Sequence, residues 1–433
     1  MARVAVIGSG IAGLAAAHAL RDHAQVTLFE AERRCGGHAH TVDLTLEGVT
    51  HGVDTGFLVF NQRTYPQLLK LFADLQVDTA ASDMSFSVQD PASGLEWSGS
   101  SLDTVFAQRR NLISPRFLGM LADILRFNRL CTELARQGAD AALAEPIGDF
   151  LDRHRFGRPF RDGYLLPMIG CIWSCPTDQM LRFPVATLIR FCHNHGLLQV
   201  SDRPQWFTVR GGSREYVRRI VSRLPDVRTG TPVHAVRRLP PGQGVAGVWV
   251  DSAAGSERFD EVVLACHTDQ SLRLLGDADA DERAVLGAIR YQPNRAVLHT
   301  DERLLPTRRK AWAAWNYERA ADAGREQTAV CLHYWINRLQ PLPWQRPVIV
   351  SLNPAREPDP RTVMGVFDVE HPVFDAAAID AQRRLPGIQG RSHLWFAGAW
   401  ARYGFHEDGL CAGLAVADAL KARWAAQGQV RAA

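Results

Sequence analysis

The sequence predicts an α/β fold with a doubly wound, Rossmann-like nucleotide-binding domain and a second, discontinuous α+β domain. Three observations carry this prediction. An apolar run at residues 3–7, typical of a buried strand, leads directly into a cluster of glycines. An alanine-rich helix is expected at 11–20, and a second strand at 26–29 ends at Glu30. Strand, helix and strand in this order are typical of a doubly wound parallel sheet.

The chain is expected to leave this first domain and to return to it. The strand–helix alternation is lost from about residue 76, and apolar runs at 232–236, 261–265 and 394–397 then predict further strands, followed by a helix at 409–420. The nucleotide-binding domain is therefore assigned residues 1–75, 205–270 and 390–433. The remaining segments, 76–204 and 271–389, would form a substrate-binding domain.

Within the second domain, residues 103–155 have a helical pattern with one broad apolar face. This face is expected to contain Phe117, Leu118, Leu121, Ile124, Leu125 and Leu130. Residues 164–200 are apolar, aromatic and interrupted by prolines, which predicts a packed but irregular region. Further strands are expected at 295–300, 329–336 and 347–352.

Composition limits the possible classes of function. The 433 residues are 46% hydrophobic and 22% charged, which is ordinary for a globular chain of about two domains. A net charge of +3 does not indicate a nucleic-acid partner. No run of about 18 apolar residues occurs and the N-terminal residues lack a signal-peptide pattern, so we expect a cytoplasmic protein. The eight cysteines include no C-x-x-C pair, so no metal site is expected.

The first motif, Gly8-Ser9-Gly10-Ile11-Ala12-Gly13, follows the first strand and opens the first helix. Its first glycine permits a tight turn, Gly10 lets the backbone approach a pyrophosphate, and Gly13 lets the helix pack closely on the strand. The free N–H groups at the helix N-terminus would face the phosphates. Glu30 ends the next strand, where a carboxylate accepts hydrogen bonds from ribose hydroxyls. Together these residues predict a dinucleotide site.

The second motif, Arg34-Cys35-Gly36-Gly37-His38, lies just beyond Glu30 and Ala31. A glycine pair lets the chain pass close to a second, bulkier part of a ligand. A site for NAD alone does not need this feature. The second motif, joined to the first, therefore favours FAD over NAD.

The third motif runs from Phe396 to Trp400 and continues from Gly404 to Leu410. A strand here ends in glycine and a helix begins soon afterwards, which repeats an arrangement that binds anions and dipoles. That helix could direct its N–H groups at the flavin pyrimidine edge, where negative charge develops on reduction. Alternatively, Glu407 and Asp408 are ordinary acids that cap the helix N-terminus.

These residues resemble the flavin-containing amine oxidase and phytoene desaturase superfamily over nearly the whole chain. The resemblance rests on the three motifs and on Val53–Phe57, Trp206–Ser213 and Ala311–Tyr317. In particular, the chain resembles a bacterial branch of FAD-binding proteins associated with cyclopropane or methyl-branched fatty-acid modification. The resemblance implies a GR2-type FAD fold in which a substrate domain covers the flavin face.

The resemblance also implies a place for each candidate cofactor-binding residue. Those expected at the pyrophosphate are Gly8, Ser9, Gly10 and Gly13, with Ile11 and Ala12 between them. Glu30 would hold the adenosine ribose beside Ala31, and Val233 would contact adenine. Arg34, Gly36, Gly37 and His38 would follow the pyrophosphate and ribityl chain. Gly398, Asp408, Gly409 and Leu410 would lie beside the ribityl chain and isoalloxazine.

Three departures from the family pattern weaken the amine-oxidase interpretation. The strand that carries a flavin-linked lysine in amine oxidases is Tyr291–Val297 here, and it contains no lysine. One position of the aromatic cage that holds the amine corresponds to Phe405, but the sequence does not identify its partner. The acid that often follows the Phe-Ala-Gly strand end is replaced by Ala399.

Three hypotheses for the function follow. The first is desaturation, or a related redox reaction, of a lipid acyl chain by hydride transfer between a substrate carbon and flavin N5. The aromatic residues suited to an apolar pocket are Phe86, Trp97, Trp173, Trp312, Trp315, Tyr317 and Trp335. The second hypothesis is oxidation of a small amine or polyamine. The third is a non-redox role as a flavin-bound isomerase or binding protein.

The candidate catalytic residues are His406 and Glu407, next to the expected flavin-facing turn. Residues 109–130 combine basic residues with an apolar helical face, as a helix on a membrane surface does, although packing between domains also explains the pattern. Peripheral contact with the inner face of the membrane therefore stays open. The sequence carries no signature of the electron acceptor.

Overall fold

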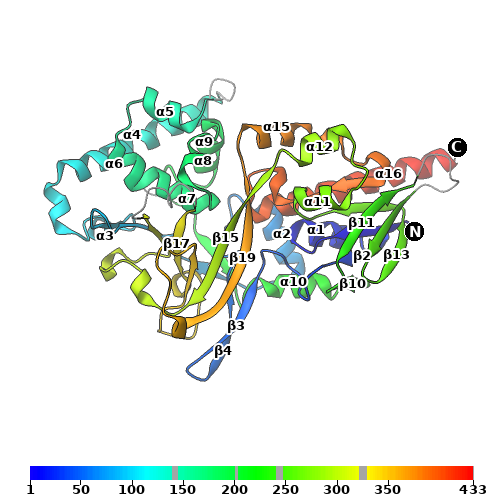
Figure 1. The fold of residues 1–433 in the computed structure, drawn as a ribbon, viewed down its shortest axis with the longest axis horizontal. Coiled ribbons are helices and arrows are strands. Elements are labelled where there is room, and N and C mark those ends of the chain that lie inside the picture. The colour runs from blue at the N-terminus through cyan, green and yellow to red at the C-terminus, as the bar shows by residue number, and fades with distance from the viewer. Residues whose placement is uncertain (139–144, 200–202, 240–246, 321–328, 433) are drawn as a thin grey trace.

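A five-stranded parallel sheet occupies the side of the molecule on which both termini lie, at the right of Figure 1. The computed structural model describes residues 1–138, 145–199, 203–239, 247–320 and 329–432. The strands, in order across the sheet, are β10 (Asp226–Arg228), β2 (Gln25–Phe29), β1 (Arg3–Ile7), β14 (Glu261–Leu264) and β20 (Leu394–Phe396), and every pairing is parallel. Four of these strands agree with the sequence prediction, and β10 was missed.

The two faces of this sheet are covered differently. On one face, Val4, Val6, Val26 and Leu28 pack in a core with α1 (Ile11–Leu20) and α16 (His406–Ala432). On the other face, Ala5, Ile7 and Phe29 pack in a core with a three-stranded antiparallel sheet. Its strands are β11 (Val233–Arg238), β12 (Val248–Ser252) and β13 (Gly255–Phe259). The sheet is therefore buried on both sides, as parallel sheets usually are.

The last helix corrects one prediction. α16 begins at His406 and continues to Ala432, whereas the sequence predicted residues 409–420. It packs along α1, where an added Cβ at Gly413 would lie 2.1 Å from the carbonyl oxygen of Ala12. Small residues thus let the two helices approach closely.

A seven-stranded mixed sheet lies on the other side of the molecule (Figure 1). In order its strands are β19 (Val363–Val373), β15 (Arg290–His299), β18 (Ile349–Leu352), β17 (Cys331–Trp335), β16 (Trp315–Glu318), β7 (Phe86–Asp90) and β8 (Leu95–Ser98). The long β15–β19 pair crosses the centre of the view. All seven strands fall in 76–204 and 271–389, and we propose these segments as the substrate-binding domain.

Helices cover this second sheet on one side. They are α3 (Leu102–Val105), α4 (Pro115–Gln137), α5 (Ile147–Arg153), α6 (Arg158–Phe160), α7 (Leu166–Trp173), α8 (Thr177–Met180) and α9 (Val185–Asn194). The prediction of an irregular region at 164–200 was therefore wrong. The three prolines that suggested it lie at helix starts: Pro167 in the first turn of α7, and Pro176 and Pro184 at the N-caps of α8 and α9. A proline costs little at these positions, because the N–H group it lacks has no partner within the helix.

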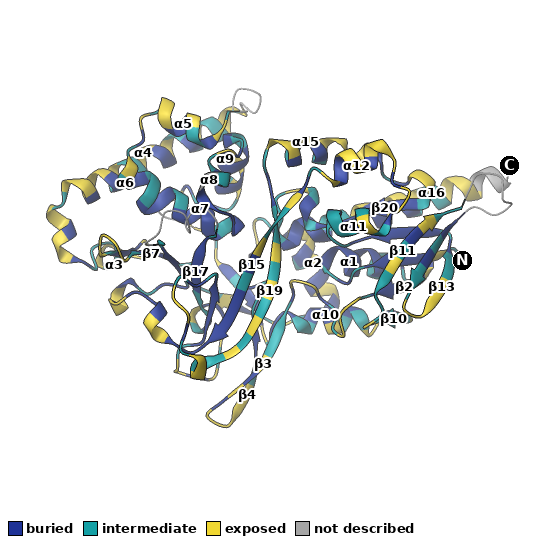
Figure 2. Ribbon diagram, viewed as in Figure 1, coloured by how far each residue is buried: buried dark blue, intermediate teal, exposed yellow. Residues whose placement is uncertain are grey.

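The broad apolar face predicted for the helix at 103–155 is divided in the structure. Phe117, Met120 and Phe127 of α4 are buried, whereas Leu118 and Leu125 are exposed. Figure 2 shows exposed residues along α4 and α3 at the edge of the molecule farthest from the termini. No helix among the described residues is long and apolar enough to cross a membrane.

Smaller elements complete the fold. They are the hairpin β3 (Thr41–Leu46) and β4 (Val49–Asp54), the sheet of β5 (Phe60–Asn61), β9 (Trp206–Val209) and β6 (Thr79–Ser82), and the helices α2 (Pro66–Leu75), α10 (Arg214–Val221), α11 (Thr268–Leu274), α12 (Ala280–Leu286), α14 (Ile336–Leu339) and α15 (Ala376–Arg384). The buried carboxylate of Asp54, at the end of β4, accepts hydrogen bonds from Thr41, Ser213 and Gln340. It thereby links three segments that are far apart in sequence.

Candidate active site

One cavity of about 1390 Å³ is lined by residues from both sides of the molecule. A typical small-molecule site has roughly 300–1,000 Å³, so this cavity has room for a dinucleotide and a further molecule. Twelve of the seventeen predicted cofactor-binding residues line it: Gly8, Ser9, Gly10, Ile11, Ala12, Glu30, Ala31, Arg34, Gly37, His38, Val233 and Gly398. Three segments that are distant in sequence therefore meet at one cavity.

The N-terminus of α1 suits a phosphate group. The N-cap residue is Gly10, no side chain caps the helix, and its first turn contains no acidic residue. A Cβ added to Gly10 would meet no atom within 4 Å, although Gly10 lines the cavity. The first N–H groups of a helix have no partner within it and carry partial positive charge. These observations fit the pyrophosphate of FAD.

Ser9 of the first motif is hydrogen-bonded to Glu30 and to the second motif. The backbone N–H and the hydroxyl of Ser9 both donate to Glu30 Oε2, at 2.9 and 2.5 Å. The N–H of Gly36 donates to the carbonyl oxygen of Ser9 at 3.0 Å. Arg34 donates to the carbonyl oxygen of Gly37 at 2.9 Å. The turn of the first motif is therefore held against the second motif by residues predicted to bind the cofactor.

Five predicted cofactor-binding residues are not among the described residues that line the cavity: Gly13, Gly36, Asp408, Gly409 and Leu410. The glycines here serve packing. A Cβ at Gly13 would lie 1.9 Å from the carbonyl oxygen of Gly8, and one at Gly409 would lie 2.7 Å from Ile11 Cγ2. Gly36 has a φ of +121°, which a side chain rarely adopts.

Asp408 and Leu410 also face the protein rather than the cavity. Asp408 Oδ2 accepts the N–H of Phe405 at 3.0 Å, as a capping acid does. Burial raises the pKa of Asp408 to about 6, against the effect of this hydrogen bond. Leu410 is buried in the core beside α1. Asp408 thus caps its own helix, which is the alternative considered for the third motif, and its contact with the ribityl chain stays a prediction.

Glu407 has a structural place as well. Its two carboxylate oxygens accept the N–H groups of Gln67 and Leu68, at 2.8 and 2.9 Å. These groups lie in the first turn of α2, whose N-cap residue makes no side-chain hydrogen bond. Glu407 thus caps α2 from α16, and this geometry does not support the catalytic role expected from the sequence.

His406, the other candidate catalytic residue, does line the cavity. Its ring stacks on Phe57 with centroids 3.8 Å apart, and its Nε2 lies 2.6 Å from the hydroxyl of Tyr216. Burial lowers the pKa of His406 to about 3 and raises that of Tyr216. At neutral pH Tyr216 therefore keeps its phenolic proton and His406 is neutral, and the two share one hydrogen bond.

The free energy of unfolding is expected to fall on acidification because of His406. Its folded-state pKa is about 3, against an ordinary 6.5. The unfolded chain therefore binds the proton first, so the stabilisation is complete above pH 6.5 and is lost as the pH falls towards 3. One such group contributes at most about 1.4 kcal/mol per pH unit. Urea unfolding of the wild type and of His406→Phe between pH 7 and 5 measures this slope, and equal slopes would contradict the assignment.

One group of residues lining the cavity, which we call its apolar end, is mainly apolar. The described residues there are Met84, Phe86, Met168, Cys171, Ile172, Ser174, Phe191, His195, Leu197, Trp206, Trp315, Tyr334 and Phe405. The described carboxylates that line the cavity are Glu30, Glu32, Asp368 and Glu370. Of the seven aromatic residues predicted for an apolar pocket, Phe86 and Trp315 line the cavity. Trp97, Trp173 and Tyr317 are buried in the core instead, and Trp312 and Trp335 pack on each other.

The structure supplies a neighbour for Phe405. Its ring stacks on Phe191 of α9, with centroids 4.8 Å apart and planes 21° apart. Phe191 also stacks on His195, at 3.9 Å, and the His195 ring lies 5.7 Å from that of Phe405. Two rings at 4.8 Å are in contact, so no substrate amine fits between Phe405 and Phe191.

Several lining residues escaped the sequence analysis. His267 and Tyr291 stack at 4.1 Å, and His371 of β19 lies 5.4 Å from His38. All of them line the cavity, as does Trp400. Tyr291 is the first residue of Tyr291–Val297, the strand that carries a lysine in amine oxidases. The strand was identified from the sequence, but Tyr291 was not predicted to line the cavity. The pairing of β15 with β19 places Tyr291 opposite Pro372, next to His371, and no local motif reports it.

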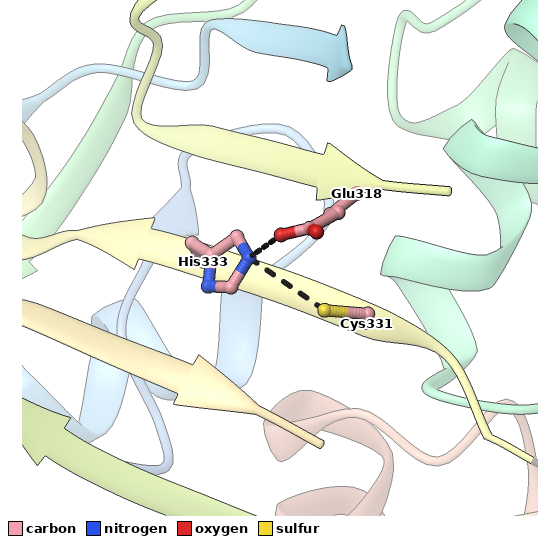
Figure 3. A group of neighbouring side chains, drawn as sticks. All are labelled: Glu318, Cys331 and His333. Carbon is pink, nitrogen blue, oxygen red and sulfur yellow. Dashed lines mark hydrogen bonds and ion pairs between the residues drawn. The ribbon is translucent and has the colours of Figure 1, made fainter. Parts of the chain in front are cut away.

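Figure 3 shows the group of described side chains that could hold a metal ion: Glu318, Cys331 and His333. His333 Nε2 lies 3.0 Å from Glu318 Oε2 and 3.6 Å from Cys331 Sγ. Burial lowers the pKa of His333, but Cys331 and Glu318 outweigh it and raise the pKa to about 9. Nε2 therefore keeps a proton, which it donates to Glu318. We interpret the group as a buried hydrogen-bonded cluster.

Comparison with known proteins agrees with this architecture. Residues 11–319 match the model of the family described as flavin containing amine oxidoreductase. The carotenoid phi-ring synthase of Streptomyces griseus is 28% identical over 317 residues, which cover 67% of this chain and 58% of that protein. The match thus spans little more than half the length of this curated relative.

Solved structures share the fold at low sequence identity. A fatty acid isomerase from P. acnes is 16% identical with a TM-score of 0.66, covering 96% of this chain and 97% of its own. Cyclohexylamine oxidase from Brevibacterium oxydans is 16% identical with a TM-score of 0.70, covering 98% and 99%. The chain belongs to the flavin containing amine oxidoreductase family, and its cofactor is FAD.

Proposed function

We propose that the protein is an FAD-dependent oxidoreductase that desaturates a lipid acyl chain or carries out a related redox reaction on one. The observation that carries this proposal is the apolar end of the cavity, which is continuous with the nucleotide end. When bound, FAD supplies the hydride acceptor. The fatty acid isomerase and the carotenoid synthase named above support an apolar substrate.

The described residues suit this reaction in two ways. Methionine, phenylalanine and tryptophan side chains would exclude water from an acyl chain and hold it by contact, because they offer large apolar surfaces. His406 is neutral and is held in the cavity wall by its stack on Phe57 and its hydrogen bond with Tyr216. We propose it as a residue that positions the cofactor.

Oxidation of an amine is the alternative that the family name favours. Two features count against it. The cavity-lining residues of β15 are Tyr291, Pro293, Asn294 and Arg295, with no lysine. The ring of Phe405 is also packed against Phe191. Isomerisation without net oxidation is the third possibility, and the mass of the product separates it from desaturation.

The test uses FAD-loaded protein without oxygen. Phospholipids with unsaturated, cyclopropane or methyl-branched acyl chains, and a panel of mono- and polyamines, are each mixed with the protein. We expect lipid alone to bleach the visible flavin absorbance, with acyl chains that lose two hydrogens. Bleaching by amines alone would overturn the proposal. Altered acyl chains of unchanged mass would assign an isomerase.

Narrowing the apolar end should slow the lipid reaction selectively. Ile172 lines that end, and Ile172→Trp would fill space that the acyl chain needs. We expect the rate with lipid to fall at least about tenfold, or about 1.4 kcal/mol, at unchanged FAD content. Met364→Trp, at an exposed position on β19, is the matched control. An unchanged rate in Ile172→Trp would place the substrate elsewhere.

A further inference from the structure

Exposed apolar side chains are concentrated at one edge of the molecule. Nine large hydrophobic residues among the described ones are exposed, and five of them lie between residues 102 and 125: Leu102, Leu112, Ile113, Leu118 and Leu125. Ile113 is 84% exposed and Leu102 79%. Scattered single residues of this kind need no explanation, but a cluster indicates an interaction surface.

The local structure explains why these side chains face outward. Leu112 and Ile113 lie in a 3-10 turn, η1 (Arg109–Ile113), that runs directly into α4. The hydroxyl of Ser114 caps α4 by accepting the N–H of Phe117. Within α4, Leu118 and Leu125 are seven residues apart and share a face, while Phe117 and Phe127 fill the core on the other side. The core of this domain is therefore filled from one face of α4, and Leu118 and Leu125 on the other face stay exposed.

The same segment is positively charged. Residues 102–130 contain five arginines and only two acids, Asp103 and Asp123. Asp103 pairs with Arg109 and Lys310, and Asp123 pairs with Arg126. The other three arginines, Arg110, Arg116 and Arg129, have no carboxylate partner among the described residues. Two of them, Arg110 and Arg116, also line a second cavity of about 270 Å³ under the start of α4.

We infer that this edge docks on an anionic phospholipid bilayer. We call it the α4 surface: Leu102, Leu112, Ile113, Leu118 and Leu125 with Arg110, Arg116 and Arg129. The leucines and Ile113 enter the boundary between headgroups and acyl chains, and the arginines meet lipid phosphates, as in helices that lie in a membrane interface. A hydrophobic partner protein would explain the leucines alone, whereas an anionic bilayer explains the arginines too. Docking is independent of the proposed reaction, because it needs no turnover.

The test is sedimentation of FAD-loaded protein with vesicles of phosphatidylcholine alone or mixed with phosphatidylglycerol. We expect binding to the mixed vesicles and much weaker binding to phosphatidylcholine. Leu112→Ser with Ile113→Ser, and separately Arg110→Gln with Arg116→Gln, should each weaken binding at least about tenfold. Because all four residues are exposed or line a surface cavity, the flavin spectrum should be unchanged.

Met364→Ser with Val366→Ser is the matched control, since these residues are exposed on β19, away from the α4 surface. It should bind vesicles as the wild type does. The inference is overturned if the wild type ignores anionic vesicles, or if the two α4 variants bind as well as the control. It is also overturned if light scattering shows that the wild type is a dimer and the Leu112 and Ile113 variant a monomer, while neither protein binds vesicles. Loss of turnover with intact vesicle binding would count against the proposed reaction alone.

Discussion

Gly10→Val is expected to give a folded protein that binds FAD at least about 100-fold more weakly. Gly10 has φ −62° and ψ 174°, a conformation that any residue can adopt. A Cβ there meets no protein atom within 4 Å, so the fold should tolerate it. The added side chain would occupy the space through which a pyrophosphate approaches the N-terminus of α1. A 100-fold loss corresponds to about 2.7 kcal/mol.

Equilibrium titration of apoprotein with FAD, together with thermal unfolding of the apoprotein, measures both parts of this prediction. Gly119→Val is the control, because Gly119 lies in the second turn of α4 and, like Gly10, has no atom near its ideal Cβ. It should bind FAD normally. Gly13→Val should instead prevent folding, since its Cβ would overlap the Gly8 carbonyl. Normal FAD affinity in Gly10→Val would place the cofactor elsewhere.

Asp54→Ala is expected to lower the free energy of unfolding by roughly 3 kcal/mol or more. Burial raises the pKa of Asp54 to about 6, so its carboxylate is ionised at neutral pH and depends on its donors. Those donors are the Thr41 hydroxyl at 2.5 Å, the Ser213 N–H and hydroxyl at 2.9 and 2.8 Å, and the Gln340 amide at 2.7 Å. Removing the carboxylate takes the acceptor from all of these donors, of which Ser213 and Gln340 are buried.

Asp43→Ala is the comparison, because it removes a carboxylate from the neighbouring strand that is exposed and pairs with Arg214 at the surface. An exposed ion pair is worth about 0–1 kcal/mol, so this variant should unfold almost as the wild type does. Urea unfolding of both variants provides the measurement. Similar losses in the two would mean that Asp54 does not hold the segments together.

The sequence predicted the nucleotide side of this protein well for a physical reason. Gly8, Gly10 and Gly13 are constrained by local geometry: a turn, an approach to a ligand and a helix–strand contact within six residues. A constraint of this kind leaves a fixed spacing in the sequence. Four of the five strands of the parallel sheet were therefore predicted from their apolar runs, supported at β1 by the glycines and at β2 by Glu30 that follow them. Only β10 was missed.

The rest depended on contacts between distant segments. Glu407 and Asp408 suggested chemistry from their position beside a glycine turn, but their partners are the N–H groups of α2 and of Phe405. Likewise, the periodicity of α4 did not reveal that Phe117 faces the core while Leu118 faces outward. The stack of His267 on Tyr291 depends on where α11 lies beside β15, which no short motif encodes.

The central claim is that FAD and an acyl chain occupy one continuous cavity. It is tested most directly by titrating FAD-loaded protein, without oxygen, with a phospholipid that carries methyl-branched acyl chains or with an amine of similar size, while the visible spectrum of the flavin is recorded. The account predicts a saturable spectral change with the lipid that is weakened in Ile172→Trp, and none with the amine. A saturable change or bleaching with the amine, together with silence for the lipid, would contradict it.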